Sequence, residues 1–235
     1  MAANKSPRSL GNKELFVRLD DNFVEPAGKQ PVLRPRDLTF LIPYASVLAG
    51  LYWLKSAWAA LLLYQFGMAA VLLARKAGPG IGRLHIAAPA IFWLALVSSL
   101  LSGPALYLLW PLVKLPGQGM GEALARFGLQ GTSFLLFAAC YSSLHPLLEE
   151  MYWRFGDEPG HARYGIDLLF AGYHMLVLAF FLKPIYLGLV FLALASAGMA
   201  WRRMVAEHDD RLAAVLVHAA GDISTIAAAA VLAIR

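Results

Sequence analysis

LAAVLVHAAGDISTIAAAAVLAI, from Leu212 to Ile234, is the stretch that decides the fold. It is long enough to cross the hydrocarbon core of a bilayer, which takes about 20 mainly apolar residues in a helix. Its only ionisable side chains are His218 and Asp222. The stretch therefore predicts a transmembrane helix that carries two groups whose burial in hydrocarbon needs a functional reason.

The composition extends this prediction to the whole chain. Of its 235 residues, 59% are hydrophobic and 15% are charged, whereas a soluble domain carries about 25% charged residues. We predict an all-α, multi-spanning transmembrane helix bundle of about seven spans, with a range of six to eight. The spans are expected at about Leu38 to Leu51, Trp58 to Ala74, Ile86 to Leu109, Gly131 to Tyr152, Ile166 to Leu182, Ile185 to Trp201 and Leu212 to Ile234.

Two parts of the chain differ in composition. Residues 1–37 are polar and of mixed charge, and we interpret them as an N-terminal tail. Residues 38–235 form the predicted transmembrane domain. The first predicted span is the shortest of the seven and contains Pro43.

Charge sets the expected orientation. The net charge of +5 does not indicate a nucleic-acid-binding protein, because the Lys and Arg residues stand at the ends of apolar spans rather than on one face. With the N-terminus inside, fifteen Lys and Arg residues lie on the inner side and five on the outer side. This bias predicts a cytoplasmic N-terminus in the cell inner or plasma membrane.

Three spans carry ionisable groups at similar depth. Glu149 lies near the inner end of the fourth span, His174 about two turns into the fifth, and His218 under two turns into the seventh. We expect them to meet in a water-accessible cavity that opens to the cytoplasmic side.

Helical spacing sorts the neighbouring groups. His218 and Asp222 are four residues apart and share a face, and Glu150 and Arg154 stand in the same relation and can neutralise each other. Glu149 is then left without a local cation, which makes it a candidate general base.

These residues form three motifs that resemble a known family. They read EExxxR from Glu149 to Arg154, FxxxH from Phe170 to His174, and HxxxD from His218 to Asp222. In this order they resemble the CPBP family of intramembrane endopeptidases, which includes the type II CAAX prenyl endopeptidases and the Abi proteins. The resemblance covers about residues 142–224, and the family-like core is about 131–235.

The resemblance implies a glutamate-dependent peptidase without a cofactor. Glu149, assisted by His174, would activate a water molecule, while His218 and Asp222 would stabilise the oxyanion or orient the water. Glu150 with Arg154 would brace the structure, and His145 is either a supporting group or packing. The substrate would be a peptide or membrane-protein segment, with or without a lipid. The chain departs from the family pattern at two positions, with Phe155 where Gly is common and Asp222 where Asn is frequent.

Other functions stay open. A zinc-dependent variant could use Glu149, His174 and His218, since one carboxylate and two imidazoles form a known catalytic zinc set. A non-proteolytic carrier or membrane scaffold would need the same buried groups for proton relay or for packing. The motifs HExxH and GxSG are absent, which argues against a zincin and against a rhomboid serine protease.

Overall fold

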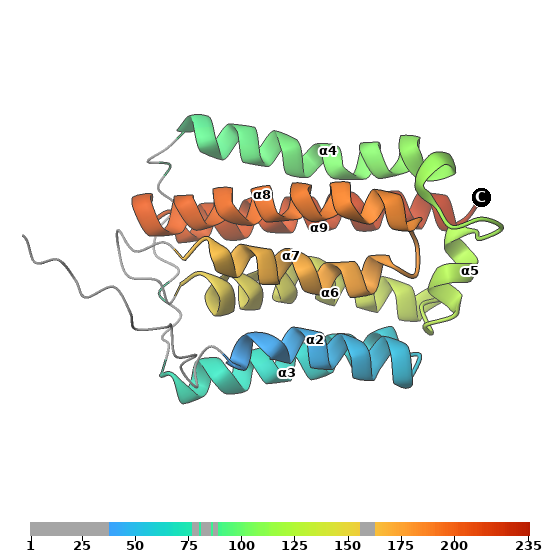
Figure 1. Cartoon of the computed structure of the whole chain (residues 1–235), viewed down its shortest axis with the longest axis horizontal. Helices are drawn as coiled ribbons and strands as arrows, with labels where there is room; N and C mark the ends of the chain where they lie inside the picture. The colour runs from blue at the N-terminus through green and yellow to red at the C-terminus, as the bar shows by residue number, and fades with distance from the viewer. Residues whose placement is uncertain (1–37, 77–79, 81–85, 87–88, 156–162) are drawn as a thin grey trace, which may run out of the picture. The chain divides into compact units, whose positions relative to one another are not determined.

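The computed structural model describes residues 38–76, 80, 86, 89–155 and 163–235, so the predicted tail at 1–37 lies outside the described residues. The described part is all-helical and contains no strand (Figure 1). Its elements are η1 (Thr39–Leu41), α2 (Ile42–Val47), η2 (Leu48–Trp53), α3 (Ala57–Ala74), α4 (Pro89–Val113), α5 (Met120–Ala125), α6 (Gly131–Trp153), α7 (Gly165–Leu178), α8 (Pro184–His208) and α9 (Arg211–Ala233).

Four of the described helices are long and apolar enough to cross a membrane, namely α3, α4, α8 and α9. Their composition indicates a membrane-embedded protein. The continuous helical segment Thr39–Trp53 and α7 are apolar but shorter. The 23-residue α6 is less apolar, because it carries His145 and two glutamates. Helices thus occur at all seven predicted positions, and four of them have the length and apolarity of a span.

The long helices run side by side along one direction (Figure 1). α6 and α7 lie between the α2–α3 hairpin on one side and the α8–α9 pair on the other, and α4 packs on the outer side of α9. The fourth, fifth and seventh predicted helices are therefore neighbours in the middle of the bundle. This arrangement places the motif-bearing helices against one another.

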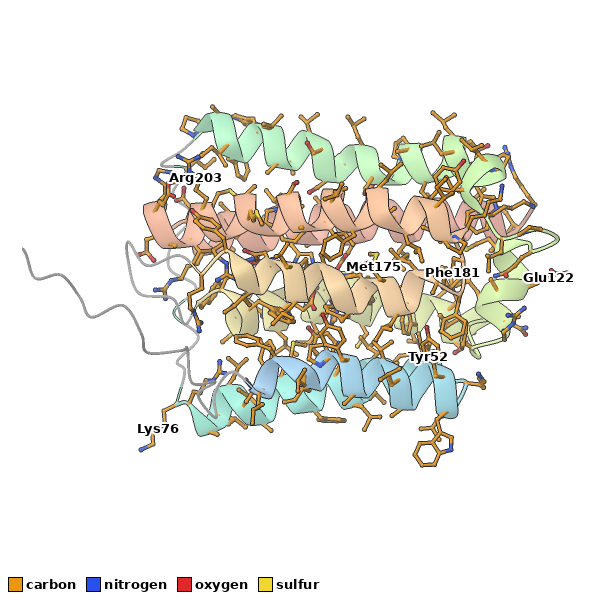
Figure 2. All side chains as sticks on the ribbon, viewed as in Figure 1. Tyr52, Lys76, Glu122, Met175, Phe181 and Arg203 are labelled. Atoms are coloured by element: carbon orange, nitrogen blue, oxygen red, sulfur yellow. The ribbon has the colours of Figure 1, made fainter. Side chains whose placement is uncertain are left out.

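Basic side chains mark one end of this bundle. Figure 2 shows Lys76, after α3, and Arg203, near the end of α8, at the same end, with Glu122 of α5 at the opposite end. Arg203 pairs with Glu207 one turn further along α8, at 2.7 Å. The two labelled cations lie at helix ends that the charge distribution predicts to be on one side of the membrane.

Close packing of α4 on α9 depends on a glycine beside a proline. Pro104 has no N–H to donate to the Leu100 carbonyl, and the Ser224 hydroxyl of α9 donates to that carbonyl at 2.6 Å instead. The same hydroxyl accepts the N–H of Gly103 at 3.0 Å. A Cβ added to Gly103 would collide with the Ser224 backbone. Gly103 is therefore required for the helices to approach this closely.

We expect Gly103→Ala to lower the free energy of unfolding by about 1–3 kcal/mol, the usual cost of overpacking a close contact. The measurement is reversible unfolding in mixed micelles. Gly188→Ala is the matched control, because a Cβ at that position of α8 meets nothing within 4 Å. The control should be neutral or stabilising by up to about 1 kcal/mol, since Ala favours the helix over Gly. Equal effects of the two substitutions would contradict this account.

Candidate active site

Glu149 projects from α6 into the centre of the bundle, where it is fully buried. Its Oε1 atom accepts two hydrogen bonds of 2.5 Å, one from the Tyr64 hydroxyl of α3 and one from the Tyr173 hydroxyl of α7. The Trp153 indole N–H donates to the Tyr64 oxygen at 2.8 Å and so orients that hydroxyl. One oxygen of the carboxylate is thereby held firmly by three helices.

The other oxygen, Oε2, has a different environment. It accepts no hydrogen bond among the described residues, and it faces two imidazoles. The Nε2 atom of His145 is 3.6 Å away and that of His218 is 3.4 Å away. The Oδ2 atom of Asp222 lies 3.8 Å from the same His218 nitrogen. Two carboxyl oxygens and two ring nitrogens therefore converge at separations slightly longer than direct hydrogen bonds.

The orientation of His218 is set by its other nitrogen. Nδ1 lies 2.8 Å from Oε1 of Glu150, and because a carboxylate only accepts hydrogen bonds, Nδ1 carries the hydrogen. Nε2 is then the atom turned toward Glu149. The ring also stacks on Trp201 of α8, with centroids 4.4 Å apart. Glu150 and Trp201 together hold the imidazole in one tautomer and one plane.

His174 does not contact Glu149 directly. Its Nδ1 is 2.8 Å from the Phe170 carbonyl oxygen, and its Nε2 is 3.1 Å from the Tyr173 hydroxyl. That hydroxyl is the one that reaches Glu149. Of the two imidazoles predicted to meet Glu149, that of His218 therefore faces the carboxylate directly. That of His174 is separated from it by the Tyr173 hydroxyl.

The Glu150–Arg154 pair is present and belongs to a larger buried ionic network. Arg154 NH1 lies 2.6 Å from Glu150 Oε1, and Arg154 NH2 lies 3.3 Å from Asp167 Oδ1 of α7. Arg202 of α8 also pairs with Asp167, at 2.6 Å. All four side chains are fully buried. The network ties α6, α7, α8 and, through His218, α9.

Asp167 lies in the first turn of α7, at the end of that helix, whereas Arg202, one of the fifteen cations counted on the inner side of the membrane, lies within α8 and not in a loop. Both are buried inside the bundle and paired with each other. The reason is that α8 continues to His208, beyond the predicted end of its span, so Arg202 faces the neighbouring helices.

In the described part of the chain, this site is closed and not the open cavity that the sequence predicts. Glu149 is fully buried and only 3% of His218 and of His145 is exposed, because aromatic rings of Tyr64, Trp153 and Trp201 close around them. The structure describes these residues in a closed arrangement.

The zinc set of Glu149, His174 and His218 is not assembled either. Both nitrogens of His174 face groups of its own helix, and no group of three His, Cys, Asp or Glu side chains within the described residues has an arrangement that could hold a metal ion. The ligand geometry thus gives no support to the zinc variant.

Two contributors were missed by the sequence analysis, Tyr64 and Tyr173. Tyr173 stands directly before the motif histidine, and Tyr64 lies in a span without any motif. A tyrosine in a membrane helix is usually interfacial, so neither residue type nor spacing signals such a role. Burial of both hydroxyls against one carboxylate is a tertiary feature.

The arrangement combines an anchored carboxylate with one oxygen that accepts no hydrogen bond among the described residues, an imidazole fixed by a second carboxylate, and further polar groups around them. Its motif residues come from the segments of α6, α7 and α9, and its two tyrosine hydroxyls come from α3 and α7. In comparisons with known proteins, no family model, no curated protein and no solved structure matches this chain.

Proposed function

We propose that this protein is an intramembrane endopeptidase that hydrolyses peptide bonds by a glutamate-dependent mechanism, as the three motifs resembling the CPBP family suggest. The substrate is a peptide or a membrane-protein segment, with or without a covalent lipid. No nucleic acid and no metal cofactor take part in the proposed reaction.

The observation that supports this proposal most strongly is the unequal environment of the two Glu149 oxygens. Oε1 is held by two tyrosine hydroxyls, while Oε2 faces His145 and His218 and accepts no hydrogen bond from any residue that the structure describes. A general base needs this combination, since its position must be fixed while one lone pair stays directed at the proton it takes.

In the proposed step, a water molecule bound between Glu149 Oε2 and His218 Nε2 attacks the scissile carbonyl carbon. Glu149 takes one proton of the water as the new carbon–oxygen bond forms. His218 begins the step neutral, with its hydrogen on Nδ1 held by Glu150 and with Nε2 turned to the water. Glu149 passes the proton on to Nε2, and the protonated ring then faces the developing oxyanion or the leaving nitrogen. Asp222 orients the His218 ring from one turn deeper in α9. Stabilisation of charge by such fixed groups is usually the largest contribution to catalysis.

The membrane arrangement is also proposed. The helices at the seven predicted positions cross or enter the bilayer, the N-terminus and the end of the bundle with Lys76 and Arg203 face the cytoplasm, and the site lies in the inner half of the membrane. The protein would reside in the inner or plasma membrane. Because the described site is closed, a change of conformation precedes the entry of a substrate between the helices.

The decisive experiment compares purified wild-type protein with Glu149→Gln on a peptide library, with and without a chelator. We expect the wild type to cleave a subset of peptides in both conditions and Glu149→Gln to cleave none. Equal cleavage by the two proteins would remove the enzyme assignment. Activity that the chelator abolishes would favour the zinc variant over the metal-free mechanism.

A carrier or a scaffold would cleave no peptide in this assay, and separate measurements would identify each of them. A carrier would move its cargo into proteoliposomes without any peptide product, and a scaffold would keep its cellular role in the Glu149→Gln variant. Either outcome, together with an absence of cleavage by the wild type, would replace the peptidase proposal.

A further inference from the structure

We propose that Tyr173 is a proton-transfer residue that connects His174 to Glu149, so that His174 sets whether Glu149 is ionised. This inference rests on the proposed function, and it assigns a chemical task to a tyrosine at an unspecified position of the FxxxH motif. It also explains how His174 assists Glu149 without touching it.

The two tyrosine hydroxyls that contact Glu149 Oε1 differ in their second hydrogen-bonding partner. Tyr64 accepts the indole N–H of Trp153 at 2.8 Å, so its hydrogen can only point to the carboxylate. Tyr173 has Glu149 Oε1 at 2.5 Å on one side and His174 Nε2 at 3.1 Å on the other. Its single hydrogen can point either way. Tyr64 is therefore a fixed donor, and Tyr173 is a reversible one.

Proton counting defines two states of this path. The Phe170 carbonyl can only accept, so His174 Nδ1 carries a hydrogen in both. In the first state Glu149 is a carboxylate, Tyr173 donates to it, and protonated Nε2 of His174 donates to the tyrosine oxygen. In the second state Glu149 carries the proton on Oε1 and donates to Tyr173, which donates to the neutral imidazole. The two states contain the same number of protons.

Passing from the second state to the first makes Glu149 a base. The O–H bond of Glu149 breaks as one forms on Tyr173, and the original O–H bond of Tyr173 breaks as an N–H bond forms on His174. No electron is gained or lost. Oε2 of Glu149 can then take a proton from water. Among the described residues, the other charged and titratable groups that act on this path are Tyr141, His145 and Arg154 from the α6 segment, Tyr64 from α3, and His218 and Asp222 from α9.

The test is a pair of double-mutant cycles on the turnover number. One cycle combines Tyr173→Phe with His174→Asn, and the matched cycle combines Tyr64→Phe with His174→Asn. Both tyrosine substitutions remove one hydrogen bond from Glu149 and keep the ring. We expect a coupling of at least about fivefold in the first cycle and less than about twofold in the second. Equal couplings in the two cycles would overturn the proposal.

A second measurement needs no substrate and so separates this proposal from the proposed function. In protein labelled with ¹⁵N-histidine, Glu149→Gln should shift the Nε2 signal of His174, because the two groups share a proton. We expect this shift of the Nε2 signal to fall below about half of its original size when the protein also carries Tyr173→Phe. The shift should persist when the protein carries Tyr64→Phe instead. A response that survives in both backgrounds refutes the path even if Glu149-dependent cleavage is observed. A response lost only with Tyr173→Phe supports the path even if no cleavage is found.

Discussion

Asp167→Ala is expected to lower the free energy of unfolding by about 3–5 kcal/mol, the usual cost of removing one partner from a buried ion pair. Asp167 accepts hydrogen bonds from Arg154 and from Arg202, and all three side chains are fully buried. Among the described residues, this network with Glu150 contains two carboxylates and two guanidinium groups. Removing Asp167 takes away a negative charge that both buried arginines contact, in a place that water does not reach.

The measurement is reversible unfolding in mixed micelles, followed by circular dichroism. Glu207→Ala is the control, because it also removes a carboxylate from an arginine pair, with Arg203 at 2.7 Å, but in an exposed position. That substitution should leave the unfolding transition unchanged, since exposed ion pairs contribute little. If Asp167→Ala is tolerated as well as Glu207→Ala, the buried network does not hold the four helices together.

Glu150→Gln is expected to lower the turnover number of the proposed peptidase by about 10²- to 10⁴-fold, with a smaller effect on KM. Glu150 Oε1 holds the Nδ1 hydrogen of His218 at 2.8 Å. A glutamine can present its NH₂ group to Nδ1, which moves the ring hydrogen to Nε2 and turns the wrong face of the imidazole toward Glu149. Loss of the correct tautomer has a cost of about this size in carboxylate–histidine pairs of hydrolases.

Glu150 also pairs with Arg154 at 2.6 Å, so a loss of stability must be separated from a loss of catalysis. Arg154→Lys weakens the same pair but leaves the Glu150–His218 contact, and it should reduce stability with little change in turnover by the folded fraction. ¹⁵N spectra of His218 should show the tautomer change only in Glu150→Gln. An unchanged tautomer and a turnover number within about threefold of the wild type would sink this assignment.

Much of the fold could be predicted because the bilayer imposes simple rules on a sequence. Apolar stretches of spanning length can only be helices there, since every backbone polar group must be satisfied internally. Helices therefore occur at the predicted positions, and α9 differs from the predicted Leu212 to Ile234 by one residue at each end. Helix ends were less predictable where charges are buried, as in α8, whose extension to His208 brings Arg202 into the bundle.

The candidate site could be predicted only in part. Ionisable groups are rare in apolar helices because their transfer into hydrocarbon costs free energy. Glu149, Glu150, His174 and His218 could therefore be chosen from the sequence. Spacing within one helix also predicted the Glu150–Arg154 pair, which forms at 2.6 Å.

Only the tertiary structure decided which helices meet and which atom faces which. It brought Tyr64 from a helix without motifs onto Glu149, put Tyr173 between Glu149 and His174, and closed aromatic rings over the group. The physical reason is that hydrophobicity and helical period act along one chain segment, whereas contacts between helices depend on side-chain packing across the bundle. From the sequence one can therefore predict that a buried carboxylate needs hydrogen-bonding partners, but only the packing of the helices determines which residues these are.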